Sequence, residues 1–139
     1  MKNEKSPLYN KNVQKVLSKL ISEEMLANNM YRISIIACNP LESIKIADMF
    51  RETADDELMD HHKNLVKFAV MNDYDVPCQD KEYKKFASET AWKSYDNIKK
   101  DQDAKYYIDL AIKAEEDACD SYLKAMDVED IPYELYAII

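Results

Sequence analysis

Two glutamates stand inside apolar patterns of the chain, where a carboxylate is unexpected. Glu24 follows Leu20 by four residues and precedes Ala27 by three, so it shares the apolar face of the helix that this spacing predicts. Glu115 follows Ala111 by four residues in a second apolar stripe. Burying a carboxylate without a partner is costly and favours its protonation. Both glutamates are therefore candidates for a binding or catalytic site.

A second set of candidates is clustered between residues 56 and 61. Glu57 lies seven residues after Phe50 in another apolar stripe, and His61 follows it by four residues, with Asp60 beside them. Carboxylates with one imidazole suit iron or manganese, whereas thiolates would suit zinc. Helix bundles build such centres from side chains on facing helices. These residues therefore predict a metal centre held by several helices.

Each candidate also has a simpler interpretation. An acidic residue within a stripe often lies at its edge, with the carboxylate in water. A histidine in a core is more often hydrogen-bonded than metal-bound, and of the neighbours His61 and His62 one should face solvent. The sequence leaves both interpretations open.

The two glutamates are each followed by a tyrosine at the same spacing. Tyr31 lies seven residues after Glu24, and Tyr122 lies seven residues after Glu115. The alanine three residues after each glutamate also matches, at an offset of 115 − 24 = 91 residues. This echo predicts two helices that build matching halves of one site.

Long helices must position these residues. The sequence predicts an N-terminal tail, residues 1–10, followed by one helical domain, residues 11–139. Within the domain, the apolar periodicity predicts helices over about 12–38, 41–72, 80–99 and 104–127, and the start of another at 132–139. The break at Asn39–Pro40 makes the first two helices an antiparallel hairpin, and Pro132 precedes the last helix. Asp103 is the predicted N-cap of the helix that follows it. We therefore expect an all-α bundle with an additional short crossover helix.

The composition supports this fold class. The 139 residues include no glycine, and sheet proteins depend on glycine for turns with positive φ. The same absence excludes the P-loop and the dinucleotide-binding fingerprint. The formal net charge of −8 argues against nucleic acid and anionic membranes as partners.

The cysteines and the N-terminus indicate the compartment. Three widely spaced cysteines without a CxxC pair predict reduced thiols: Cys38, Cys78 and Cys119. The first ten residues carry no apolar segment typical of a secretory signal. We therefore expect a cytoplasmic protein.

These residues together resemble the ferritin-like superfamily, and especially its bacterioferritin- and rubrerythrin-type di-iron bundles. In that family the first-helix glutamate has a tyrosine seven residues on, and a second-helix glutamate follows 33 residues later, as 57 − 24 = 33 gives here. The stretch from Glu57 to His61 is similar to the family's second-helix Glu-x-x-His motif. The resemblance implies that Glu24 is a terminal iron ligand, Glu57 a bridging carboxylate and Glu115 the third-helix ligand. Tyr31 would be a hydrogen-bonding or redox neighbour.

The resemblance also implies a fold and a function. The fold is a ferritin-like four-helix bundle that holds an iron pair, with manganese as the other metal that the donor set suits. The reaction is the oxidation of Fe(II) by oxygen or peroxide, which would make an intact protein a ferroxidase-type oxidoreductase in iron storage or oxidative-stress protection. The partner implied is another copy of the chain, in a dimer or a cage.

The sequence departs from the family pattern at two places. Asp60 stands three residues after Glu57, where the histidine should be, and His61 is one residue late. Either Asp60 is the ligand, or a local π-type bulge brings His61 into place. The fourth-helix Glu-x-x-His is expected 91 residues after Glu57, which lies past Ile139.

Two further alternatives stay open. In another register the segments 80–99 and 104–127 are the third and fourth helices, with Glu89 as the third ligand and Glu115 or Glu116 as the fourth. The Glu-to-Tyr echo favours the first register. The rival function is a metal-free bundle with a structural role in a larger assembly, such as a virus particle or an encapsulated compartment. The displaced histidine and the apolar end, residues 136–139, favour that rival.

Overall fold

The fold consists of helices joined by short connections, as a computed structural model shows for residues 9–37, 44–89, 93 and 96–139. Within these ranges the side chains of residues 44 and 57–59 lie outside the description. The helices are α1 (Lys11–Ala37), α2 (Ile44–Asp56), the π-helix η1 (Glu57–His62), α3 (Lys63–Met71), α4 (Asp80–Phe86), α6 (Ala104–Met126) and α7 (Tyr133–Ile138). No strand occurs in the described ranges. The expected all-helical fold is confirmed for these residues.

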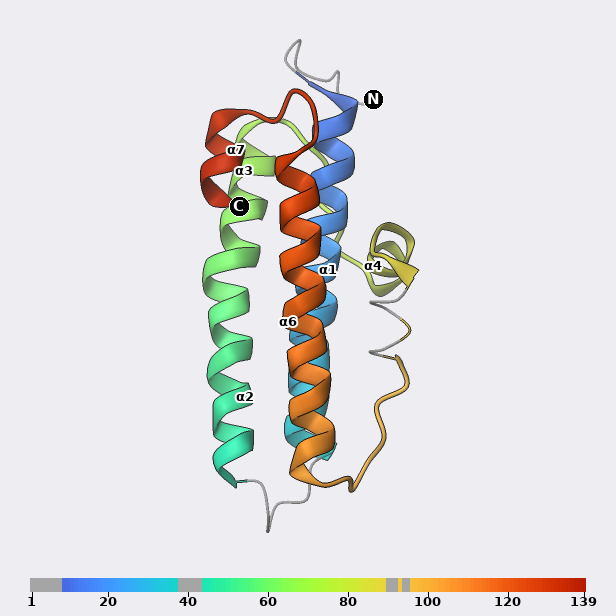
Figure 1. Cartoon of the computed structure of the whole chain (residues 1–139). Coiled ribbons are helices and arrows are strands. Elements are labelled where there is room, and N and C mark those ends of the chain that lie inside the picture. Colours follow the sequence, from blue (N-terminus) through green and yellow to red (C-terminus); the bar gives the residue numbers. More distant parts are fainter. Residues whose placement is uncertain (1–8, 38–43, 90–92, 94–95) are drawn as a thin grey trace.

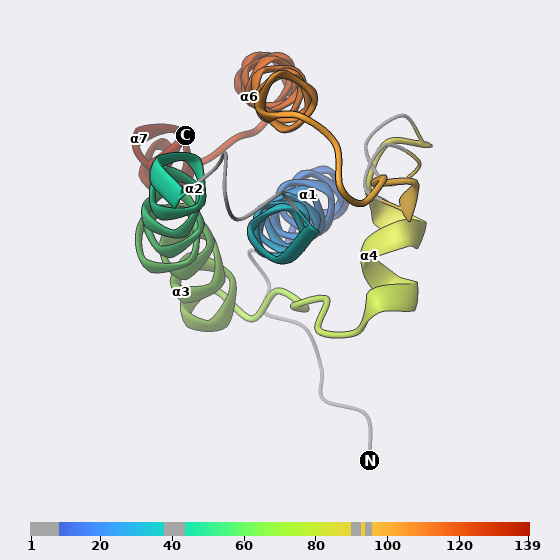
Figure 2. The same cartoon turned by 90° about the horizontal axis from the view of Figure 1, so that it is seen from below.

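Helix α1 is the central element of the bundle. Seen along the bundle axis, the rod formed by α2, η1 and α3 lies on one side of α1, α6 on a second and α4 on a third (Figure 2). Both the rod and α6 run antiparallel to α1 (Figure 1). Because neighbours surround α1, it buries polar as well as apolar side chains, including Ser22, Asn28 and Ser34.

Two apolar clusters of described residues lie in the interior, one toward each end of α1. The first contains Val13, Leu17 and Leu65, and the second contains Met30 and Phe50. On α1 the first cluster ends at Ile21 and the second begins at Leu26. The residues between them include buried Ser22, Glu23 and Glu24. A polar layer therefore separates the two cores in the middle of the bundle.

The chain makes left-handed turns without glycine. Among the residues that the structure describes, three aspartates have positive φ: Asp73 (61°), Asp101 (54°) and Asp130 (69°). Asp73 follows α3, and the amide of Tyr74 donates to the carbonyl of Ala69 at 2.8 Å, which is the helix-ending pattern that glycine usually supports. Asp130 has this conformation two residues before Pro132, which precedes the last predicted helix, while Asn39–Pro40 lies outside the described residues. Short polar side chains tolerate this backbone region better than most.

The predicted crossover helix 80–99 is interrupted, although Glu89, Lys93 and Asp96 beyond the interruption are again helical. Helix α4 ends at Phe86, and Ala87 is extended, with ψ at 158°. Residues 90–92 and 94–95 of that prediction lie outside the described residues. By contrast, Asp103 is confirmed as an N-cap, since its side chain accepts a hydrogen bond from the amide of Tyr106 at 3.0 Å.

The apolar C-terminal segment packs mainly on the chain's own core. Leu135 is fully buried, and Ile138 and Ile139 pack against the cluster that contains Leu65, whereas Tyr136 stays exposed. Ile138 and Ile139 are half-buried by this packing, and Ala137 is exposed like Tyr136. None of the helices that the structure describes combines the length and apolar character required to cross a bilayer.

Candidate metal centre

The two predicted Glu–Tyr helices contact each other crosswise. The hydroxyl of Tyr122 on α6 donates to Glu24 Oε1 on α1, and the hydroxyl of Tyr31 on α1 donates to Glu115 Oε1 on α6 at 2.6 Å. Because the helices are antiparallel, a step of seven residues along one matches the same step along the other in reverse. The repeat in the sequence thus becomes a pair of reciprocal hydrogen bonds with approximate two-fold symmetry.

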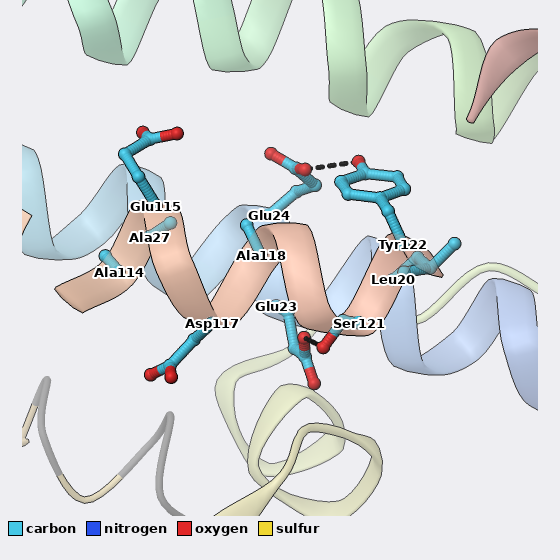
Figure 3. A pocket seen from close by; sticks show the side chains of 10 residues that line it. All are labelled: Leu20, Glu23, Glu24, Ala27, Ala114, Glu115, Asp117, Ala118, Ser121 and Tyr122. Atoms are coloured by element: carbon cyan, nitrogen blue, oxygen red, sulfur yellow. Dashed lines mark hydrogen bonds between the residues drawn. The ribbon is translucent and has the colours of Figure 1, made fainter. Parts of the chain in front are cut away.

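The site side chains point toward the second-helix rod. Figure 3 shows Glu24, Glu115 and Tyr122 on the side of α1 and α6 that faces the α2–η1–α3 rod. Glu24 is 4% exposed, whereas Glu115 is exposed and accessible to water. The two carboxylates therefore differ in environment, although their hydrogen bonds match.

The π-helix brings His61 to this site. Its Nδ1 lies 3.7 Å from Glu24 Oε1, and its ring meets that of Tyr122 edge-on with centroids 6.4 Å apart. A π turn contains one residue more than an α turn. In the π-helix, His61, four positions after Glu57, therefore points in nearly the direction that a residue three positions after Glu57 would have in an α-helix. Of the two alternatives in the sequence, the structure contains the π segment, at Glu57–His62.

A groove open to solvent leads to the same residues. Its walls come from α1, α2, η1 and α6 and include Tyr31, Asp56, Asp60, His61 and Glu115. Asp60 is exposed there beside His61, while His62 is half-buried, and burial lowers its pKa. Three carboxylates, those of Asp56, Asp60 and Glu115, therefore line this groove.

The other candidate ligands of the sequence lie elsewhere or lack a described side chain. Glu57 begins η1, but its side chain lies outside the description. Glu89 forms an exposed ion pair with Lys93 at 2.5 Å, and Glu116 is exposed on α6. The ion pair with Lys93 thus ties Glu89 to the crossover segment rather than to this centre.

The sequence did not reveal two buried polar residues near the centre. Glu23 accepts hydrogen bonds from Ser121 Oγ at 2.6 Å and from the amide of Ser88 at 3.3 Å, on the side of α1 away from the rod (Figure 3). Asn28 donates to the carbonyl of Ala54 on α2 at 2.7 Å. A single-face helical pattern gives no signal for Glu23, which α1 buries on another side. Asn28 follows Glu24 by four residues and precedes Tyr31 by three, so it lies within the stripe of Glu24, but its neutral amide does not mark it as a metal ligand.

The donor chemistry at this centre fits iron. The carboxylates of Glu24 and Glu115 lie on the side of α1 and α6 that faces the rod, with the His61 imidazole 3.7 Å from Glu24, and a tyrosine hydroxyl donates to one oxygen of each carboxylate. Such outer hydrogen bonds orient metal ligands. Among the side chains that the structure describes, which do not include Glu57, no three His, Cys, Asp or Glu residues are close enough to bind one ion. A complete first coordination sphere would need Glu57 or a small rearrangement.

The comparison with known families agrees with this geometry. The sequence model of the rubrerythrin family matches residues 15–133, a range that includes every candidate ligand. Searches of curated proteins and of solved structures each found no match. Because this match covers most of the sequence, the chain belongs to the rubrerythrin family, a family of ferritin-like di-iron helix bundles.

Proposed function

We propose that this protein binds an iron pair between α1, η1 and α6 and oxidises Fe(II) with oxygen or peroxide. The observation that carries the proposal is the convergence on Glu24: its carboxylate accepts from Tyr122 and lies 3.7 Å from His61 Nδ1. Glu24, His61 and Glu115 would be ligands, with Glu57 bridging as the family resemblance implies. Asp60 remains the alternative to His61. The physiological role would be iron storage or protection from oxidative stress.

The chain's own residues would prepare the site for a cation. Glu24 lies between two apolar clusters, so its negative charge gains more from a bound cation than an exposed carboxylate would. Tyr122 and Tyr31 each fix the orientation of one carboxylate. Asp56 and Asp60 line the groove and would attract cations from solvent. Iron, when bound, would supply the one-electron redox chemistry.

The experiment is anaerobic addition of Fe(II) followed by oxygen or peroxide, with the near-ultraviolet absorbance of ferric products as the readout. Wild-type protein should bind iron and oxidise it faster than buffer does. Glu57→Ala should abolish both properties, whereas Glu116→Ala, an exposed carboxylate on α6, should leave them unchanged. Unaltered iron stoichiometry in Glu57→Ala would show that Glu57 is a surface acid.

The rival function, a metal-free bundle in a larger assembly, corresponds to the opposite outcome. It predicts no bound iron and no absorbance change in any variant. Light scattering of the purified protein would test the homo-oligomer that both proposals allow. Side chains such as Ile36 (85% exposed) and Tyr133 (80% exposed) offer apolar surface for such contacts.

A further inference from the structure

Asn28 is a buried amide one helical turn from Glu24 on α1. It is 4% exposed, and its Nδ2 donates to the carbonyl oxygen of Ala54 on α2 at 2.7 Å. A carbonyl oxygen only accepts hydrogen bonds, so the amide nitrogen must face it. This bond joins the central helix to the rod three residues before η1 begins.

The bond fixes the position of η1 along the axis of α1. The rod is antiparallel to α1 (Figure 1), so four residues from Asn28 back to Glu24 correspond to four residues forward from Ala54 to position 58. In the sequence, position 58 lies between Glu57 and His61. The register set by Asn28 is therefore the one in which His61 lies beside Glu24.

The acceptor also lies where the helix changes type. In a continuous α-helix the Ala54 carbonyl would accept from the amide of residue 58, which belongs to η1. A side chain that bonds to a carbonyl within a helical ladder promotes local departure from α geometry. The Asn28 amide is directed at this point of the rod.

We propose that Asn28 is a positioning residue, whose amide holds the Ala54 carbonyl and thereby places η1 and His61 beside Glu24. It does not touch the metal. The effect of Asn28 on Fe(II) affinity rests on the proposed function, whereas its effect on the position of His61 does not. Loss of an outer residue that orients metal ligands typically lowers metal affinity about 10- to 100-fold.

The test compares Asn28→Leu, which keeps the shape and removes the donor, with Ser34→Ala on the same helix. Ser34 is also fully buried, and its hydroxyl contacts Met30 Sδ of its own helix at 3.7 Å. In the metal-free protein, the nuclear Overhauser contact between the rings of His61 and Tyr122 should disappear in Asn28→Leu and persist in Ser34→Ala. Fe(II) affinity should fall about 10- to 100-fold in Asn28→Leu alone.

The outcomes separate this inference from the proposed function. Persistence of the His61–Tyr122 contact in Asn28→Leu would overturn the role of Asn28. Loss of the contact in a protein whose wild type binds no iron would support that role and refute the iron site. Should Asn28→Leu not fold, hydrogen exchange of the Asn28 side-chain amide in wild-type protein decides: slow exchange supports the bond, and exchange at the rate of a free amide overturns the proposal.

Discussion

His61 Nδ1 lies 3.7 Å from Glu24 Oε1, although the two residues belong to different helices. Their approach depends on the π-helix Glu57–His62, because the family pattern would put a histidine one position earlier. The π segment thus accommodates the one residue that this chain has between Glu57 and His61 beyond the two of the family pattern. It leaves the apolar residues beyond it, Leu65 and Phe68, directed to the core.

Deletion of Asp60 tests this role of the π segment. The deletion would restore the spacing Glu-x-x-His and convert η1 to a regular α-helix, with Leu65 and Phe68 on their present faces. We expect little change in the free energy of unfolding, measured with urea, and retained Fe(II) binding. If Asp60 itself is the ligand, iron binding is lost instead.

Deletion of Lys67, an exposed residue in α3, is the matched control. It rotates the rest of α3 by about 100° and turns Phe68 and Ala69 away from the core. We expect destabilisation of at least about 3 kcal/mol. Equal destabilisation by the two deletions would contradict the role assigned to the π segment.

The two tyrosines should differ in their contribution to stability. Tyr122→Phe removes a donor from Glu24, which is buried, so it should cost about 1.5–3 kcal/mol in the metal-free protein. Tyr31→Phe removes a donor from the exposed Glu115, where water can replace it, and should cost about 1 kcal/mol or less. Urea denaturation of both variants provides the comparison. A larger loss for Tyr31→Phe would mean that the environments of the two glutamates are reversed.

Much of this arrangement could be predicted from the sequence, because periodicity reports which face of a helix is buried. The stripes located α1 and α6 to within one residue at each end, and they placed Glu24 in the interior. They gave no signal for Glu23, since α1 is covered on several sides and Glu23 lies on the side away from the rod, whereas Asn28, four residues after Glu24, lies within the stripe. The crossing of the Glu–Tyr pairs depends on the antiparallel packing of α1 and α6, which no local pattern contains.

The left-handed aspartates provide a further prediction, independent of the centre. Asp73 has φ of 61° after α3, a conformation that costs a residue with a Cβ about 1–2 kcal/mol relative to glycine. Asp73→Gly should therefore be neutral or stabilising, by up to about 1 kcal/mol, because glycine's greater freedom in the unfolded chain offsets part of the gain. Asp73→Ala should be less stable than Asp73→Gly. Thermal unfolding of the pair measures the difference, and the reverse order would contradict the strain assigned to Asp73.

Removing the charge of Glu24 should separate stability from function. Glu24→Gln keeps an acceptor for Tyr122 and eliminates a buried anion, so the metal-free protein should be as stable as wild type or more stable. A structural carboxylate would give the opposite result. Urea unfolding of metal-free Glu24→Gln and wild type distinguishes the two roles.

The most direct measurement is equilibrium dialysis of wild type and Glu24→Gln against anaerobic Fe(II), followed by iron analysis of the retained protein. The account predicts an iron pair bound per wild-type chain and its loss in Glu24→Gln, with both proteins folded. Wild-type protein that retains no iron, or a Glu24→Gln variant that retains as much as wild type, would contradict it.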